Sequence, residues 1–451
     1  MSAPALVTSQ GEAWPRERLS AEVATLAGTL RALGAGPGVV VAARAPTPAK
    51  QVVTALACLD AGAVLFPLDA SMPVLAQERL LARARPHLVV TDTAVRAEKP
   101  REALDARAGL LLFTSGSSGE PKGVVLSRAG LDANVDGILS YLPVREFPRT
   151  AVVLSLGYSY ALVGQVLTTL RAGGTVLLCN DLPTPAAQWE AMLAHGAQGL
   201  SSVPFSLRRL AQAARAGGHG EQLRYVAAAR GALDRATALE LAQTFPRARR
   251  YNQYGLTEAA PRVAAIGDDD PGFAQGAAGR PLPGVEVWAE SPEGVRLGPR
   301  GKGELYVRGP SVMLGYLDDP RGTAQVLRPD GALRAGDSGW LDERGLLFVE
   351  GRSDGVVKCA GERVHAQEVA RVLREATGLE LAVVARPHPE WGHRLRVFYE
   401  APDGARTSWP QAVKALTWAA RPYRFDRVPA LPRTPQGKHD LAALEALASV
   451  D

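Results

Sequence analysis

Hydrophobic and polar positions in the first half of the chain follow two alternating periods. Leu19, Val23, Leu26, Leu30 and Leu33 recur at helical spacing and predict an amphipathic helix that ends before Gly34. Other helix-like stretches alternate with short apolar runs that predict buried strands, at 38–45, 63–69, 87–92, 151–156, 175–179, 198–203 and 225–229. Strands that alternate with helices in this way predict an α/β fold with layered, largely parallel sheets.

The pattern changes near residue 280. Short strands between Gly and Pro turns predict a small antiparallel β subdomain over 280–350. A polar junction at 351–355 precedes about one hundred residues, the size of a small α+β domain. Its expected elements are a hairpin at 356–364, a helix at 366–376, strands at 381–386 and 394–401, and a helix at 409–420. We therefore expect a large N-terminal domain (1–350), a hinge (351–355) and a small, mobile C-terminal domain (356–451).

Composition excludes several classes of protein. With 46% hydrophobic and 22% charged residues among 451, the chain is typical of soluble globular proteins, and no apolar run is long enough to span a membrane. The net charge of +5 is too small and too dispersed for a nucleic-acid binder. Three distant cysteines and the lack of a secretory signal indicate a cytoplasmic protein without a disulfide framework or a zinc site. The oligomeric state is not readable from the sequence.

The strongest chemical signal is the segment 111–126. An apolar strand runs into a loop that holds three glycines, four hydroxyl side chains and Lys122, and a second strand-like run follows. Glycines let backbone N–H groups wrap an anion, while hydroxyls and an ammonium add donors and charge, so the loop suits a polyphosphate. It is not a Walker A loop, because Gly123 follows Lys122 where Ser or Thr is needed. Only seven of the 51 basic residues are lysines, and Lys122, Lys358 and Lys438 all lie in glycine-rich, loop-like segments.

The chain resembles the AMP-forming adenylating enzymes: acyl-CoA synthetases, adenylation domains of peptide synthetases, and luciferases. Six segments carry the resemblance in the expected order: the loop TSGSSGEPKG, YNQYGLTE (251–258), GELYVRG (303–309), RAGD (334–337), GRSD with VKCAG (351–361), and TPQGK (434–438). The resemblance implies a nucleotide site made by Thr114, Ser115, Gly116, Ser117, Ser118, Gly119, Lys122, Gly231, Tyr254, Gly255, Asp337 and Arg352.

Particular roles follow from the resemblance. Tyr254 would stack on adenine, and Asp337 would accept both ribose hydroxyls. Thr257 would donate to the α-phosphate, Glu258 would hold Mg²⁺, and Lys438 would neutralise charge as the acid attacks. Each residue also has a plainer interpretation: a core tyrosine, a turn aspartate, a helix-capping glutamate or a solvated lysine.

The implied reaction has two half-reactions. A carboxylate attacks the α-phosphate of ATP to give acyl-AMP and pyrophosphate, and a pantetheine thiol of CoA or of a carrier protein then displaces AMP. No protein nucleophile is needed, because positioning and charge neutralisation carry such transfers. Between the half-reactions the small domain would rotate about Asp354, which brings the thiol-side residues Lys358 and Gly361 toward the site.

The resemblance also places the acid pocket, at Tyr158, Tyr160, Val203, Arg230 and Asn252. Its wall is mostly apolar and aromatic, which suits an aryl or acyl acid. Because 151–180 contains no acidic residue, a buried α-ammonium would lack a partner, which argues against an α-amino acid. Arg230 stands where the family usually has glycine, and it could pair with a second carboxylate or a phenolate of the substrate. The usual arginine after the GKxD segment is Leu441 here.

Several alternatives stay open. The acid itself and the choice between CoA and a carrier protein are not determined by the sequence. An enzyme of the same chemistry could use an amine or another acceptor, or stop at the adenylate. A nucleotide-binding homologue without turnover is a third possibility.

Overall fold

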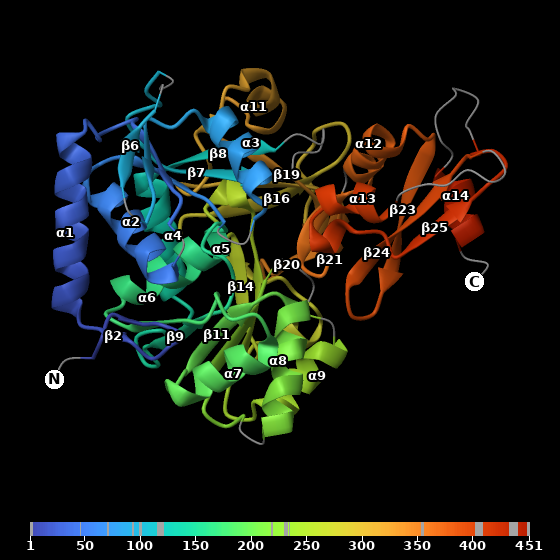
Figure 1. Ribbon diagram of the computed structural model, residues 1–451. Helices are drawn as coiled ribbons and strands as arrows, with labels where there is room; N and C mark the ends of the chain where they lie inside the picture. The colour runs from blue at the N-terminus through green and yellow to red at the C-terminus, as the bar shows by residue number, and fades with distance from the viewer. Residues whose placement is uncertain are drawn as a thin grey trace. The chain divides into compact units, whose positions relative to one another are not determined.

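The structure, a computed structural model, describes residues 3–45, 47–69, 72–92, 94–98, 102–114, 121–217, 220–229, 233, 235–352, 356–401, 409–432 and 441–448. They fall into two compact units. The first comprises the described residues of 1–114 and 122–351, and the second comprises Pro121 and the described residues of 352–451 (Figure 1). The chain has the expected mixed α/β architecture, with helices and strands alternating through the first unit.

The larger sheet of the first unit is mainly parallel. Its order over the described residues is β15-β14-β13-β12-β11-β9-β10-β1-β2, and the run from β13 through β9 and β10 to β1 is parallel throughout. The strands are β1 (Leu6–Val7), β2 (Ala13–Trp14), β9 (Arg149–Val152), β10 (Thr175–Leu178), β11 (Gly199–Ser202), β12 (Tyr225–Ala228), β13 (Arg249–Tyr254), β14 (Ala264–Gly267) and β15 (Arg280–Pro281).

A second sheet of the first unit carries the phosphate-loop strands. Its order over the described residues is β18-β8-β7-β4-β3-β5-β6. The strands are β3 (Val40–Ala43), β4 (Val64–Pro67), β5 (Leu88–Val90), β6 (Val95–Ala97), β7 (Ala108–Thr114), β8 (Lys122–Ser127) and β18 (Gly315–Tyr316). β7 and β8 pair antiparallel as far as Thr114 opposite Lys122, so the loop between them joins two adjacent strands.

Helices bury both faces of the larger sheet. Leu177 and Leu200 pack with Trp189, Met192 and Phe245 on the face covered by α7, α8 and α9, which lie side by side in Figure 1. The neighbouring positions along the same strands pack on the opposite face. Burial on both faces explains why these strands are continuously apolar.

The helices of the unit are α1 (Arg16–Ala32), α2 (Pro48–Asp60), α3 (Val74–Ala84), α4 (Arg128–Leu139), α5 (Ser159–Ala161), the π-helix η1 (Leu162–Leu167), α6 (Thr168–Arg171), α7 (Pro185–Ala194), α8 (Pro204–Gly217), α9 (Arg235–Thr244), the 3₁₀ helix η2 (Thr257–Ala259), α10 (Pro271–Ala274) and α11 (Pro320–Val326).

The expected small β subdomain is present after residue 280. Its strands are in the order β16-β17-β19-β20, and β17 pairs antiparallel with both β16 and β19. They are β16 (Glu286–Glu290), β17 (Gly303–Arg308), β19 (Leu333–Leu341) and β20 (Leu347–Arg352).

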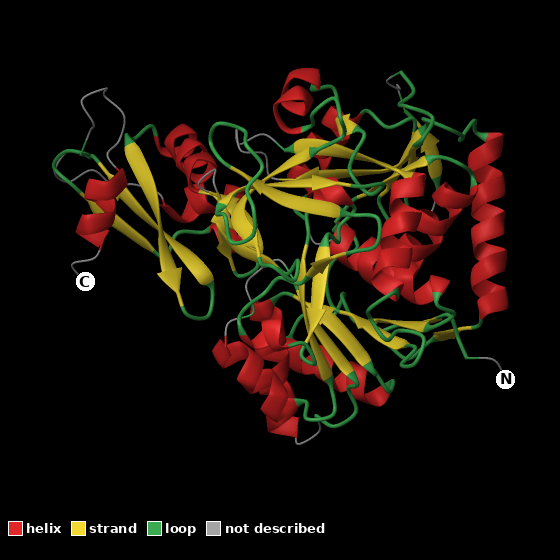
Figure 2. Ribbon diagram, turned by 180° about the vertical axis from the view of Figure 1, so that it is seen from behind, coloured by secondary structure: helices red, strands yellow, loops and turns green. Residues whose placement is uncertain are grey.

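The second unit is α+β, as expected. Its strands are β21 (Val356–Cys359), β22 (Glu362–His365), β23 (Leu381–His388), β24 (Gly392–Tyr399) and β25 (Arg424–Arg427), and its longer helices are α12 (Ala366–Thr377) and α14 (Leu441–Ala448) (Figure 2). The predicted hairpin at 356–364 is confirmed. Its turn is Ala360–Gly361, and both residues have positive φ, at 49° and 85°. Two positive φ angles in succession are typical of the tight turns that join antiparallel strands.

The single helix predicted at 409–420 is wrong. The segment instead forms α13 (Trp409–Ala412) and the 3₁₀ helices η3 (Val413–Ala415) and η4 (Trp418–Ala420), with Thr417 extended. Trp409 stacks on Phe425, and Trp418 packs on Trp391. Nine residues along an α-helix turn by about 900°, which would place the two tryptophans on opposite faces. Because the helix is broken, Trp409 packs on β25 and Trp418 packs on the turn between β23 and β24.

Within the described ranges, no helix combines the length and the apolar character needed to cross a membrane.

Candidate nucleotide and acid site

The parallel strands bring distant segments of the first unit to one edge. β13, β12, β11 and β9 are consecutive neighbours, and Ser202 lies opposite Ala228, which lies opposite Asn252. The carboxyl ends of these strands therefore meet at the same edge of the sheet, where ligands of open α/β sheets bind. Tyr158 follows β9, and Val203 follows β11. The strands that end at this edge thus lead to Tyr158, Val203 and Asn252, which the sequence predicts for the acid pocket.

Tyr254 and Asp337 are joined by a hydrogen bond. The Tyr254 hydroxyl donates to Oδ2 of Asp337 at 2.7 Å, and both residues are buried. Tyr254 ends β13, and Asp337 lies in β19 rather than in a turn. The bond connects the large sheet to the β subdomain. Two residues that are 83 positions apart in the chain are therefore adjacent in the fold.

Gly255, between Tyr254 and η2, has no room for a side chain. A Cβ at this position would lie 1.8 Å from the carbonyl oxygen of Pro261. The backbone at Gly255 therefore lies against that of Pro261, and Thr257 and Glu258 follow directly after the edge of the sheet in η2.

Tyr316 connects Glu258 with the lysine of the phosphate loop. The Tyr316 hydroxyl donates to Oε1 of Glu258 at 3.2 Å. Nζ of Lys122 lies over the Tyr316 ring, 4.8 Å from its centre. The Tyr316 backbone N–H donates to Oγ1 of Thr323 at 2.9 Å, which ties the strand β18 to α11. Two predicted nucleotide residues thus contact the same aromatic side chain, which the sequence did not single out.

The second carboxylate oxygen of Glu258 suits a cation. Oε2 is buried and has no hydrogen-bond partner among the described residues. Leaving a buried carboxylate oxygen unpaired is costly, and a hard cation would compensate it. Within the described ranges, no group of three or more His, Cys, Asp or Glu residues could hold a metal. A Mg²⁺ ion here would therefore take most of its ligands from phosphate and water oxygens, as this ion commonly does.

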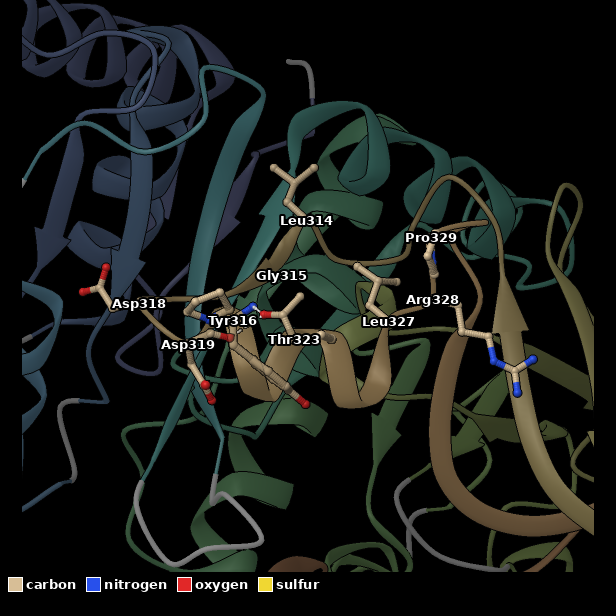
Figure 3. Close-up of a pocket in the computed structure, with 11 residues that line it drawn as sticks. Leu314, Gly315, Tyr316, Asp318, Asp319, Thr323, Leu327, Arg328 and Pro329 are labelled. Carbon is tan, nitrogen blue, oxygen red and sulfur yellow. Dashed lines mark hydrogen bonds between the residues drawn. The ribbon is translucent and has the colours of Figure 1, made fainter. Parts of the chain in front are cut away.

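A hollow of about 470 Å³ lies beside this site (Figure 3). Its lining residues all come from the segment Leu314–Pro329, and the hollow shares only Tyr316 with the contacts around Glu258. The predicted nucleotide and acid residues do not line it. The grouping of side chains at the sheet edge, rather than this hollow, marks the candidate site.

The described residues that the sequence predicts for the acid pocket differ in their burial. Tyr160 is buried in α5, Val203 is buried between β11 and α8, and Tyr158 is half-buried. Asn252 uses its side chain internally, since Nδ2 donates to the Ala277 carbonyl at 2.8 Å and Oδ1 accepts from the Gln253 backbone at 3.1 Å. Both polar atoms of the Asn252 side chain therefore bond to the protein backbone.

Several predicted residues lie outside the described part of the chain: Ser115, Gly116, Ser117, Ser118, Gly119, Arg230, Gly231, Asp354 and Lys438. Thr114 ends β7, and Arg352 ends β20. In the second unit, Lys358 lies in β21 and Gly361 forms the β21–β22 turn.

The three cysteines are poor nucleophiles. Burial raises the pKa of Cys58, Cys179 and Cys359 to about 12. A thiol with such a pKa is almost entirely protonated at neutral pH, and the thiolate is the reactive form.

Sequence reasoning missed Tyr316 and three polar residues that surround Tyr160, namely Tyr141, Gln253 and Arg262. Gln253 stands inside the YNQYGLTE segment and Arg262 four residues after it, so their proximity to the motif was the available signal. Their contacts depend on elements that are distant in the chain.

We expect Tyr316→Phe to lower the rate of nucleotide-dependent turnover by about tenfold, the order of magnitude of one hydrogen bond to a charged acceptor. Phenylalanine keeps the ring under Lys122 and removes only the donor to Glu258. The measurement is steady-state kcat and KM for ATP, with Tyr423→Phe, an exposed tyrosine of the second unit, as the control. Unchanged kinetics in Tyr316→Phe would show that the hydroxyl does not position Glu258.

Known proteins are similar to this chain in sequence and in fold. Residues 1–110 and 106–317 match the family of AMP-binding enzymes. The chain is 30% identical to a feruloyl-CoA synthase of an Amycolatopsis species, over 95% of this chain and 92% of that protein. It is also 30% identical to CymA of Salinispora arenicola, a probable non-canonical nonribosomal peptide synthetase, over 98% of this chain and 6% of that protein. The solved structure of the amide bond synthetase McbA from Marinactinospora thermotolerans matches with a TM-score of 0.85 and 27% identity, covering 99% of this chain and 97% of that chain.

Proposed function

The chain belongs to the AMP-binding enzyme family, and from that premise we propose that it is an AMP-forming acid–thiol ligase. It activates a carboxylic acid with ATP as an acyl-adenylate and transfers the acyl group to a pantetheine thiol, with coenzyme A as the first candidate. The acid is an aryl or acyl acid. The similarity to a feruloyl-CoA synthase over nearly the whole chain supports both the thiol and the aromatic class of acid.

One observation carries the proposal. Lys122 of the phosphate loop and Glu258 of the YGLTE segment both contact Tyr316. A nucleoside triphosphate with its metal ion needs a cation beside the phosphates and a carboxylate beside the metal. Here two different motifs bring these two groups close together.

The residues around this point have distinct proposed tasks. Thr114, Lys122 and the loop 115–119 hold the phosphates, and Thr257 donates to the α-phosphate. Tyr254 supports the adenine, with Gly231 and Gly255 allowing close approach of the backbone. Asp337 has a second carboxylate oxygen in addition to the one that accepts from Tyr254, and with Arg352 it binds the ribose. Glu258 would hold Mg²⁺, which supplies neutralisation of phosphate charge when bound.

The chemistry then proceeds by displacement. A carboxylate oxygen of the acid bonds to the α-phosphorus, and the bond from that phosphorus to pyrophosphate breaks. Lys438 places its ammonium at this transition state. In the second half-reaction the thiol sulfur bonds to the acyl carbon, AMP leaves, and the thiol proton passes to solvent. Asp354 is the proposed hinge, with Lys358 and Gly361 on the thiol side.

A carrier protein is the second possible thiol donor, supported by the similarity to CymA. A second candidate function is amide formation with an amine acceptor, favoured by the match to the amide bond synthetase McbA.

We further propose a cytoplasmic location, since the three cysteines are free thiols.

Two assays test the proposal. ATP–pyrophosphate exchange with aryl, fatty, dicarboxylic and amino acids should identify at least one acid that supports exchange. That acid is then offered with coenzyme A, a phosphopantetheinylated carrier protein, or an amine. Thioester with coenzyme A is the expected product. Exchange without any thioester but with amide would favour the second candidate, and no exchange with any acid would refute adenylation.

A further inference from the structure

A buried guanidinium lies directly against the acid-pocket residue Tyr160. Arg262 follows η2 and is only 2% exposed. Its guanidinium carbon is 4.7 Å from the centre of the Tyr160 ring, and its Nε donates to the Tyr141 hydroxyl at 3.1 Å. Asn134 of α4 holds its backbone, donating to the Arg262 carbonyl at 2.7 Å and accepting from its N–H at 3.1 Å. Arg262 is therefore held beside Tyr160 through both its backbone and its side chain.

The groups around this cation are neutral. The Tyr160 hydroxyl donates to Oε1 of Gln253 at 2.9 Å, and Nε2 of Gln253 donates to the Tyr141 hydroxyl at 2.7 Å. Burial raises the pKa of both tyrosines, so neither phenol supplies a negative charge at neutral pH. Among the residues that the structure describes, Arg262 makes no ion pair.

Another buried arginine of the chain has a counter-charge within the protein, whereas Arg262 has none among the described residues. Arg262 and Arg396 are the two buried arginines among the described residues. Nε of Arg396 donates to Oδ2 of Asp426 at 2.6 Å, so its charge is compensated within the protein. An uncompensated buried charge costs free energy, and proteins normally pair such groups. The described residues supply no counter-charge for Arg262, so we look for its anion beyond them.

The chemistry around Arg262 favours a carboxylate. The planar fork of a guanidinium matches the two oxygens of a carboxylate. The Tyr141 hydroxyl already accepts two hydrogen bonds, from Gln253 and Arg262, so its own proton is available to a further acceptor. A substrate phenol, with a pKa near 10, would stay neutral and would not compensate the charge.

Resting on the proposed function, we propose that Arg262 is a specificity-determining residue and that the substrate is a dicarboxylic acid. One carboxylate reacts with ATP, and the other pairs with Arg262 beside Tyr141. Arg230, the cation predicted for this task from the sequence, lies outside the described residues, and the buried position of Arg262 supplies the independent argument. Gln253 keeps Tyr160 and Tyr141 in place around the pair.

The test compares acids that differ by one charge. ATP–pyrophosphate exchange is measured with aryl and aliphatic dicarboxylic acids, with the monoamide of each, and with the matching phenolic acids. The wild-type protein should prefer the diacid over its monoamide by at least about tenfold in kcat/KM, mainly through KM, as expected for a buried charge pair. Arg262→Met should abolish this preference while its rate with the monoamide stays close to that of the wild type. Tyr141→Phe should weaken the preference in part.

Control variants separate specificity from folding. Arg171→Met removes an exposed arginine of the first unit and should leave the preference intact. Because Arg262→Met removes an unpaired buried charge, its melting temperature should not fall, whereas a purely structural arginine would be needed for stability. If Arg262→Met does not fold, the inference is tested by Tyr141→Phe and by the ratio of kcat/KM for diacid over monoamide in the wild-type protein.

The outcomes are distinct. A wild-type ratio near one, a preference for the phenolic acid, or an equal loss with all acids in Arg262→Met would overturn the inference while leaving adenylation intact. Failure of every acid to support exchange would instead overturn the proposed function itself.

Discussion

Replacement of Lys438 by alanine is expected to lower ATP–pyrophosphate exchange by about 10²- to 10³-fold, the loss typical of removing one group that stabilises transition-state charge. The effect should fall on kcat more than on KM for ATP, because the ammonium acts as the acid attacks. Thioester formation from a supplied acyl-adenylate should be nearly unchanged, since in the proposed second half-reaction this lysine has moved away. The measurement is exchange kinetics beside single-turnover transfer from the adenylate.

Lys414→Ala is the matched control for this prediction. Lys414 is an exposed lysine of the same unit, at the 3₁₀ helix η3. It should leave both half-reactions at their wild-type rates. Equal losses in the two half-reactions of Lys438→Ala would contradict the proposed alternation, and undiminished exchange would remove Lys438 from the mechanism.

Glu258→Gln should lower adenylation by about 10²-fold and raise the Mg²⁺ concentration needed for half-maximal exchange. The amide keeps an oxygen that can accept from Tyr316 but removes the negative charge at Oε2, which is buried and has no hydrogen-bond partner among the described residues. Because an unpaired buried carboxylate is unfavourable, the variant should be at least as stable as the wild type without metal. Exchange measured over a Mg²⁺ titration, together with thermal unfolding, checks both statements.

Glu293→Gln, at an exposed turn of the β subdomain, is the control and should behave as the wild type in both measurements. A normal Mg²⁺ titration in Glu258→Gln would refute its role as metal ligand. A lowered melting temperature would show instead that the carboxylate serves the fold.

Much of the fold was predictable because local pattern and tertiary environment agree. The strands of the parallel sheets are buried on both faces, so they appear as continuous apolar runs between helical stretches. The prediction of one helix at 409–420 failed because Trp409 packs on Phe425 of β25, whereas Trp418 packs on Trp391 in the turn between β23 and β24. That constraint comes from distant partners and leaves no mark on local helical spacing.

The candidate site was likewise predictable only in part from the sequence. The glycines, hydroxyls and acidic residues of the motifs indicate phosphate, ribose and metal chemistry wherever they occur, so their types and order suffice to predict a nucleotide site. Tyr316 is separated by 58 residues from Glu258 and by 194 from Lys122. No spacing rule connects such positions.

The amino-acid order alone determined the alternating α/β architecture, the small β and α+β parts, and the family of chemistry, because periodicity and motif composition are local properties of the chain. Only the folded structure decided which side chains meet: Tyr254 with Asp337, Glu258 with Tyr316, and Arg262 with Tyr141 and Tyr160. The burial of Arg262, and its lack of a counter-charge among the described residues, arise from contacts between distant segments, and the proposed choice of substrate rests on them.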